Sequence, residues 1–132
     1  MNLPDKESVF DFDFTSELTG KKYDGRFTVL CRLDMGQKHR LELEKTRLLG
    51  NYQNPTDGLA GISMVLANLR VKIIDAPEWW KQSNGGYLIE DEDALVVLYD
   101  KVLTAETEWL EKLKQKTKKA QETTEISPSL TP

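Results

Sequence analysis

The sequence predicts an α+β fold: an N-terminal β-hairpin packed on a three-helix, mostly α domain, followed by a disordered C-terminal tail. Two patterns support this. Near the N-terminus apolar and polar residues alternate, as they do along a half-buried strand. Farther along, apolar residues recur at steps of three and four, which is typical of amphipathic helices. With 132 residues, the chain has the size of one domain, which we place at residues 9–119.

The hairpin is expected over residues 9–33. Residues 1–8 are polar and contain Pro4, so we expect a flexible arm there. The first strand, VFDFDFT, places three aromatic side chains on one face: Phe10, Phe12 and Phe14. A second alternating run, RFTVLCRL, follows after the turn-rich stretch SELTGKKYDG. Two alternating runs joined by a short turn predict a hairpin.

Three helices and then the disordered tail are expected at about residues 34–49, 57–75, 91–118 and 120–132. The first helix is ambiguous, because LELE also alternates like a strand. Asp34 and Gly50 are good capping residues at its two ends and favour the helix. The second carries one apolar stripe and is expected to stop before Pro77. The third begins with acidic residues and ends with lysines, which complement the helix dipole.

Composition excludes several kinds of partner. Apolar residues make up 39% and charged residues 30% of the chain, and the net charge is −4. Nucleic-acid-binding domains usually carry excess positive charge, so no nucleic-acid partner is expected. No apolar run approaches the roughly 18 residues of a membrane span, so no membrane partner is expected either. The single cysteine, Cys31, forms no intramolecular disulfide and favours a reducing, intracellular compartment.

The sequence contains no recognisable catalytic, metal-binding or cofactor-binding motif. The lone histidine, His39, has no carboxylate or cysteine at a ligand spacing. The acidic run at residues 90–93 lacks the alternating ligands and the glycine of a calcium loop, and helix N-terminal charge explains it. We therefore expect a non-enzymatic protein without cofactor or metal. An enzyme that uses only Asp, Glu and Lys side chains is a third alternative.

The stretch DAPEWWKQSNGGYLIED contains two adjacent tryptophans. Since neighbouring side chains cannot both face one core, we expect one ring to fill a gap between helices and the other to lie partly exposed. The rings can simply close the loop over the helices, or one can anchor a partner protein, because Trp and Tyr are enriched at binding hot spots. The open edges of the hairpin offer a second surface. The candidate partner-binding residues are Trp79, Trp80, Tyr87, Phe10, Phe12 and Phe14.

Several stretches follow one another in a familiar order: FTVLCRL, KTRLLGN, LANLRVKIIDAPEWW, a glycine-bearing loop and LVVLYDKVLTAETEW. Over about residues 9–110 this order resembles the phage tail assembly chaperones, small proteins encoded in tailed-phage morphogenesis modules. The resemblance implies a non-enzymatic protein of the host cytoplasm. Such a protein binds tail-tube or tape-measure subunits before they polymerise, and has no catalytic residues.

A second function is compatible with the same patterns. A structural virion component, such as a head, connector or tail accessory subunit, would stay in the particle. Its hairpin would pair permanently with neighbouring virion subunits. Either function is compatible with a homo-oligomer.

Overall fold

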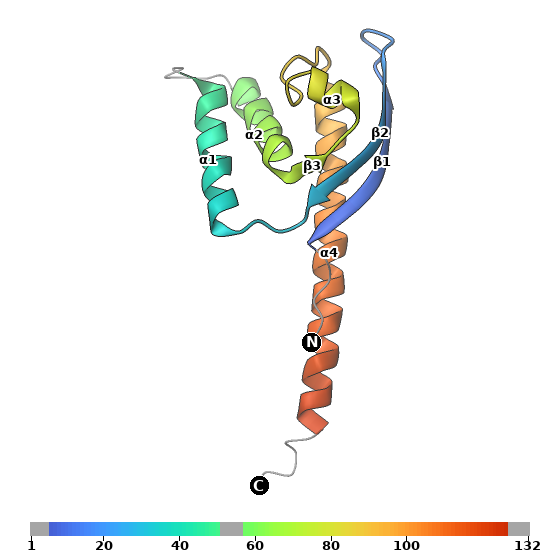
Figure 1. Cartoon of the computed structure of the whole chain (residues 1–132), viewed down its shortest axis with the longest axis vertical. Coiled ribbons are helices and arrows are strands. Elements are labelled where there is room, and N and C mark those ends of the chain that lie inside the picture. Colours follow the sequence, from blue (N-terminus) through green and yellow to red (C-terminus); the bar gives the residue numbers. More distant parts are fainter. Residues whose placement is uncertain (1–5, 51–56, 127–132) are drawn as a thin grey trace.

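The computed structural model describes residues 6–50 and 57–126 and has the α+β architecture expected from the sequence (Figure 1). In chain order the elements are β1 (Glu7–Thr15), β2 (Lys22–Leu30), α1 (Met35–Leu49), α2 (Asp57–Lys72), β3 (Ile73–Asp75), α3 (Glu78–Gln82) and α4 (Glu92–Ile126). An antiparallel hairpin of β1 and β2 packs against helices, so the predicted fold class is confirmed.

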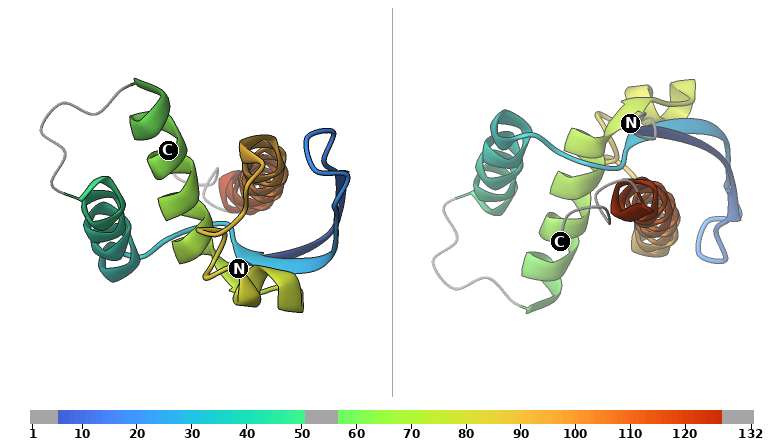
Figure 2. Two further views of the ribbon diagram at one scale, coloured as in Figure 1. Left: turned by 90° about the horizontal axis from the view of Figure 1, so that it is seen from above. Right: turned by 90° about the horizontal axis from the view of Figure 1, so that it is seen from below.

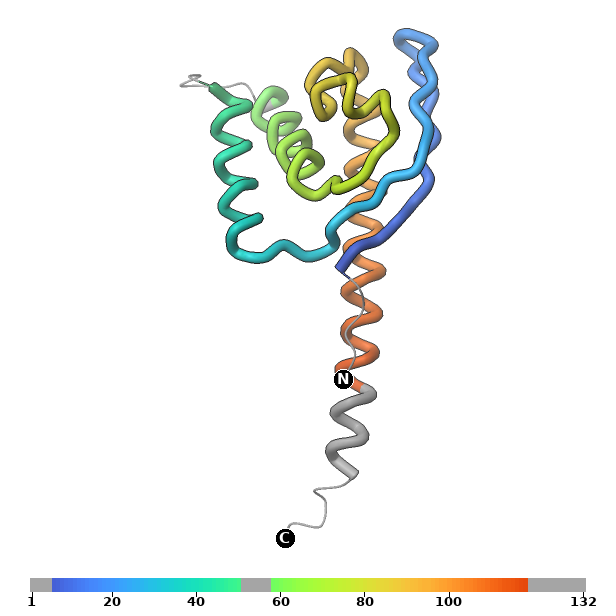
Figure 3. The backbone as a smooth tube through the Cα atoms, in the orientation of Figure 1, coloured from blue at the N-terminus to red at the C-terminus, as the bar shows by residue number. Residues whose placement is uncertain are grey.

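The long helix α4 is the axis around which the other elements are arranged. Seen end-on, α4 has the hairpin on one side and α1 and α2 on the other (Figure 2). The tube in Figure 3 follows the chain from the hairpin across to α1, back through α2 and over the sheet into the segment that contains α3. The C-terminal part of α4 extends away from the other elements (Figure 1).

The hairpin pairs in the register that its alternating sequence requires. Phe10 lies opposite Phe27, and Phe12 lies opposite Gly25. This register gathers the aromatic side chains of both strands on one face, where Phe12 and Phe27 are buried with ring centroids 5.9 Å apart. Charged side chains occupy the opposite, exposed face, as the period of two predicts.

The second helix ends earlier than the sequence predicted. α2 ends at Lys72, and Ile73–Asp75 form the short strand β3, which pairs antiparallel with β2. β-branched residues suit a strand as well as a helix. The edge of β2 offers them backbone hydrogen bonds, while the nearby Pro77 disfavours a further helical turn. Pairing with a distant strand therefore overrides the local periodicity.

The helix interpretation of residues 34–49 is confirmed by both ends of α1. Asp34 Oδ1 accepts a hydrogen bond from Gln37 N at 2.8 Å, and Gln37 Oε1 accepts one from Asp34 N at 2.9 Å. These reciprocal bonds form a capping box. Gly50 ends the helix with a φ of 61°, in the left-handed region that favours glycine.

The structure differs from the expected boundaries at both ends of the domain. β1 begins at Glu7, inside the expected arm at residues 1–8, because the polar residues before Val9 still find pairing partners on β2. α4 continues to Ile126, inside the expected tail at residues 120–132, where Ala, Gln and Glu are strong helix formers. Residues 1–5 and 127–132 of these two segments lie outside the described residues.

The core lies between the inner face of the sheet and the helices α2, α3 and α4. Its largest fully buried apolar side chains are Phe27, Leu69, Leu98, Val29 and Val102. α1 contributes no buried residue. The core therefore joins the hairpin to α2 and α4, and α1 is attached from outside.

Candidate partner-binding site

The two adjacent tryptophans of α3 both contact the chain's own core. Trp80 is buried, with 6% of its surface exposed. Trp79 is half-buried, and its ring lies edge-to-face on Tyr23 and Phe27, at centroid distances of 5.1 and 5.7 Å. Its Nε1 donates a hydrogen bond to the Asp24 carbonyl at 2.7 Å. The rings thus close α3 over the sheet. Trp80, one of the predicted partner-binding residues, is not accessible to a partner.

Glycines provide the space for this close packing. A Cβ at Gly25, whose φ is 144°, would lie 2.3 Å from Pro77 Cγ. A Cβ at Gly86, whose φ is 87°, would lie 2.6 Å from the Trp80 ring. Both distances are too short for any side chain, so the positions of α3 and the following loop depend on these two glycines.

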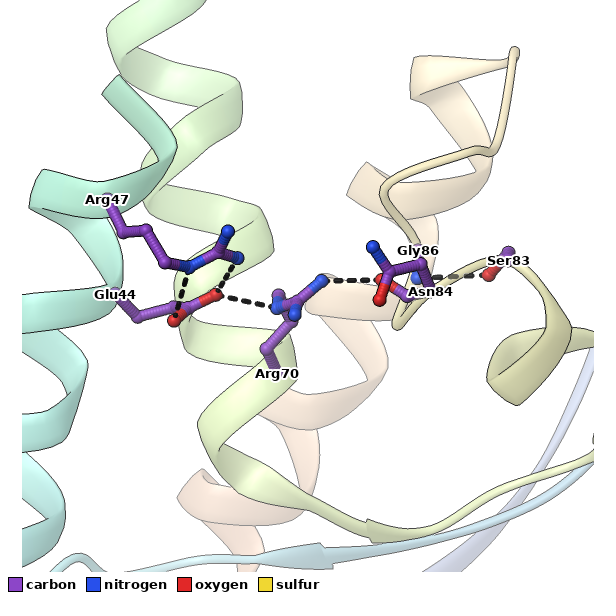
Figure 4. Close-up of polar contacts among 6 residues, drawn as sticks. All are labelled: Glu44, Arg47, Arg70, Ser83, Asn84 and Gly86. Atoms are coloured by element: carbon purple, nitrogen blue, oxygen red, sulfur yellow. Dashed lines mark hydrogen bonds and ion pairs between the residues drawn. The ribbon is translucent and has the colours of Figure 1, made fainter. Parts of the chain in front are cut away.

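A series of polar contacts fixes the loop after α3 (Figure 4). Arg70 of α2 donates a hydrogen bond to the Asn84 carbonyl, and its Nε lies 2.7 Å from Glu44 Oε1 of α1. Glu44 also binds the guanidinium of Arg47. The hydrogen bond from Arg47 lowers the pKa of the Glu44 carboxyl, although partial burial opposes this effect. These contacts join α1, α2 and the loop.

The same loop presents two exposed apolar side chains. Ser83 Oγ accepts a hydrogen bond from Gly86 N at 2.9 Å and holds the turn. Tyr87 and Leu88 follow it and are both exposed. Of the residues predicted from the sequence, Tyr87 is therefore the most accessible to a partner, and Leu88 next to it was not predicted.

The three predicted phenylalanines of β1 differ in accessibility. Phe12 is buried, because it packs under α3 and beside Phe27, and is not accessible to a partner. Phe10 and Phe14 are half-buried. Phe10 stacks on Phe27 at 5.8 Å, while Phe14 lines a groove on the surface.

This groove lies between the hairpin turn and the N-terminal end of α4 and has a volume of about 630 Å³. Its apolar walls are formed by Phe14, Leu18, Val96 and Val97. Leu18 is 75% exposed. Its acidic rim is formed by Glu17, Asp91 and Asp93. We call it the hairpin–α4 groove.

A buried hydrogen bond fixes the two walls of the hairpin–α4 groove. Ser16 Oγ donates to Asp91 Oδ2 at 2.5 Å and accepts from the backbone N–H groups of Leu18 and Thr19, each at 3.1 Å. Asp91 Oδ1 accepts from Asp93 N at 3.0 Å at the start of α4. The turn that carries Leu18 is thereby held at a defined place beside α4.

Within residues 6–50 and 57–126, no three His, Cys, Asp or Glu side chains gather closely enough to hold a metal ion. Cys31 is buried, and burial raises the pKa of its thiol, so the protonated form predominates at neutral pH. Over the same part of the chain, no helix has the length and apolarity to cross a membrane.

The sequence interpretation missed the groove itself. Leu18 stands within a turn-rich stretch and reads as part of the turn. Val96 and Val97 read as part of the apolar face of a helix. One signal was present in the sequence. Leu18 is an apolar residue in a short polar turn, where its side chain is not expected to be buried in the core. Comparisons with models of protein families, with curated proteins and with solved structures give no significant match.

Proposed function

We propose that this chain is a non-enzymatic phage assembly protein that binds an apolar segment of a structural subunit in the host cytoplasm, as a tail assembly chaperone does. The hairpin–α4 groove is the observation that supports this proposal. It combines an exposed leucine and half-buried apolar walls with an acidic rim. A tail-tube or tape-measure subunit that has not yet polymerised exposes apolar surface, which such a groove can cover.

The groove favours a segment with apolar and basic side chains. Covering one exposed leucine side chain such as Leu18 contributes about 1.5–3 kcal/mol. Glu17 and Asp93 on the rim attract basic side chains and disfavour acidic ones. We accordingly propose that apolar contacts provide most of the binding energy and that the acidic rim selects which segment binds.

A role without catalysis is consistent with the chemistry of the groove. Asp91, one of the carboxylates that line the groove, is engaged by Ser16 and by the first turn of α4. The other rim carboxylates are exposed. No nucleophile paired with a base is among the residues that line the groove.

A structural virion component is the second candidate, and the edge of the sheet favours it. In the described chain β1 pairs with β2 alone and is an edge strand. A strand of a neighbouring subunit can add to such an edge and satisfy its backbone groups permanently. This candidate places the chain inside the finished particle.

Capture from infected cells tests the proposal and separates the two candidates. The tagged chain is recovered from cells infected with the phage that encodes it, and captured proteins and purified virions are identified by mass spectrometry. A chaperone brings down tail-tube or tape-measure subunits and is absent from virions. A virion component is present in fixed copy number in the particle.

Two variants make this experiment specific to the groove. Leu18→Glu places a charge on the apolar wall and is expected to abolish capture. Leu43→Glu, at a leucine of α1 that is 58% exposed, is the matched control and should capture normally. Capture of neither structural subunit by the unaltered chain, together with its absence from virions, would refute both candidates.

A further inference from the structure

One face of α4 carries an exposed apolar stripe. Val96, Leu103 and Leu110 are 42%, 38% and 45% exposed and follow one another at intervals of one heptad. A heptad spans almost two full turns of a helix, so the three side chains lie nearly in a line. The buried side chains of α4, such as Leu98 and Val102, lie on another face. The stripe has one apolar residue per heptad, and Tyr99 and Thr107 lie beside it on the same face.

Charges at the two ends of the stripe are arranged symmetrically about Leu103. Glu92 precedes Leu103 by as many residues as Lys114 follows it, and Val96 and Leu110 are placed in the same way. At about 100° per residue, Glu92 and Lys114 point to the same side of the helix as the stripe. Both are exposed. Along this line an acidic residue comes first, three apolar residues follow, and a basic residue comes last.

We propose that two copies of this chain form a dimer through this face, with their α4 helices antiparallel and a two-fold axis beside Leu103. Leu103 then packs on its own counterpart. Val96 packs on the partner's Leu110, and Glu92 faces the partner's Lys114. A parallel pair would instead bring like charges together at both ends of the stripe. The charge pattern therefore selects a second copy, in antiparallel orientation, as the occupant of this face.

The side chains next to the stripe are compatible with this arrangement. Helical geometry places Asp100 beside the partner's Thr107, and Glu106 beside the partner's Tyr99. Glu106 already has a cation within its own chain, since its Oε1 lies 2.5 Å from Lys72 Nζ. In this arrangement Asp100 of one copy does not face Glu106 of the other.

The shape of the molecule leaves room for the second helix. α1 and α2 lie on one side of α4 and the hairpin on another, and the C-terminal part of α4 extends beyond them (Figures 1 and 2). In the antiparallel pair, the extended part of each helix runs along the start of the other. The dimer goes beyond the proposed function and does not depend on it. Val96 lies in both the seam and the hairpin–α4 groove, so the tests use residues outside the groove.

The mass of the full chain in solution is the first test, measured by light scattering and sedimentation. Twice the monomer mass is expected for the unaltered chain. Leu103→Glu brings two carboxylates together at the axis, and the mass is expected to fall by half. Leu43→Glu is the control and should remain dimeric. Circular dichroism and thermal melting check that each variant is folded. A monomeric unaltered chain, or a folded Leu103→Glu variant that stays dimeric, would overturn the proposal.

Charge reversal tests the antiparallel orientation with substitutions at exposed positions, which leave the core intact. Glu92→Lys and Lys114→Glu are each expected to raise the dissociation constant of the homodimer by about tenfold. Mixing the two single variants restores opposite charges at both ends, and so does combining both changes in one chain. Recovery of dimer in both cases is the expected result. Mixing also restores a parallel pair, so a combined variant that fails to recover the dimer would show that the antiparallel register is wrong.

The dimer covers Val96, which is also a wall of the groove, and the variants at Leu18 and Leu103 separate the two surfaces. Leu18→Glu should abolish partner capture and leave the dimer mass unchanged, while Leu103→Glu should halve the mass and leave the groove walls in place. An unaltered chain that is monomeric but captures a structural subunit would refute the dimer alone. An unaltered chain that is dimeric but captures none would refute the groove proposal alone.

Discussion

Ser16 and Asp91, which are 75 residues apart in the chain, share a buried hydrogen bond of 2.5 Å that joins the hairpin turn to the start of α4. The relationship has two consequences. It attaches the free end of the hairpin to the longest helix, and it places Leu18 opposite Val96 across the hairpin–α4 groove. This contact adds to the packing of Phe14 and Val97 on the core in defining the groove.

Ser16→Ala is expected to lower the free energy of unfolding by about 1–3 kcal/mol, because it leaves the buried Asp91 carboxylate without one of its donors. Denaturant unfolding followed by circular dichroism measures the loss. Asp91→Ala and the double variant complete a double-mutant cycle. The two losses should be clearly non-additive. Additive losses would mean that the hydrogen bond does not join the two elements energetically.

The two tryptophans should respond differently to substitution. Trp80→Ala is expected to cost about 3–5 kcal/mol of stability, since it opens a cavity beneath the loop at Gly86. Trp79→Phe keeps most of the ring contacts and removes the hydrogen bond to the Asp24 carbonyl, at a cost of about 0.5–1.5 kcal/mol. Equilibrium unfolding in urea compares them. Equal costs would contradict the assignment of Trp80 to the core.

Gly25→Ala should destabilise the fold by about 1–3 kcal/mol, because its Cβ would collide with Pro77 in a backbone conformation that side chains rarely adopt. Gly61→Ala is the matched control. Gly61 lies within α2, and nothing stands within 4 Å of a Cβ built there. That change is expected to stabilise by about 0.5–1 kcal/mol. Thermal melting checks that the two substitutions change the stability in opposite directions. A Gly25→Ala variant as stable as the unaltered chain would refute the close contact between α3 and the sheet.

Glu44 should make stability depend on pH. The hydrogen bond from Arg47 lowers the pKa of the Glu44 carboxyl below its ordinary value of 4.5. The ionised form therefore stabilises the fold fully above that value, and this contribution is lost as the pH falls through the lowered pKa.

Glu44→Gln removes this contribution and should cost about 1 kcal/mol at neutral pH. The difference from the unaltered chain should shrink in acid, as measured by unfolding at several pH values. Glu42→Gln serves as the control, because Glu42 forms only an exposed pair with Lys45 and should have little effect at any pH. A Glu44→Gln cost that does not change with pH would show that the ion pair with Arg47 and Arg70 is not its source.

The hairpin, α1 and the course of α4 could be predicted because local patterns determine them. Alternating aromatic residues define β1, and the capping residue Asp34 defines the start of α1. β3 and α3 could not be predicted in this way. β3 exists because Ile73 finds a partner on β2, a contact between segments far apart in the sequence.

The candidate site was predictable to a lesser degree. Of the aromatic residues predicted to bind a partner, Tyr87 is exposed, and Phe14 lines the groove that the sequence did not predict. The same reasoning could not separate the buried Trp80 and Phe12 from them, because burial depends on which segments pack together. Leu18 was missed for the same reason, since its place beside α4 depends on the distant Asp91.

Photo-cross-linking from the position of Leu18 tests the proposed binding groove most directly. A photoreactive amino acid replaces Leu18 in the tagged chain, and replaces Leu43 in the control, before cross-linking in infected cells. The groove account predicts cross-links to tail-tube or tape-measure subunits from position 18 and none from position 43. Cross-links that are absent from position 18, or equally frequent from both positions, would contradict it.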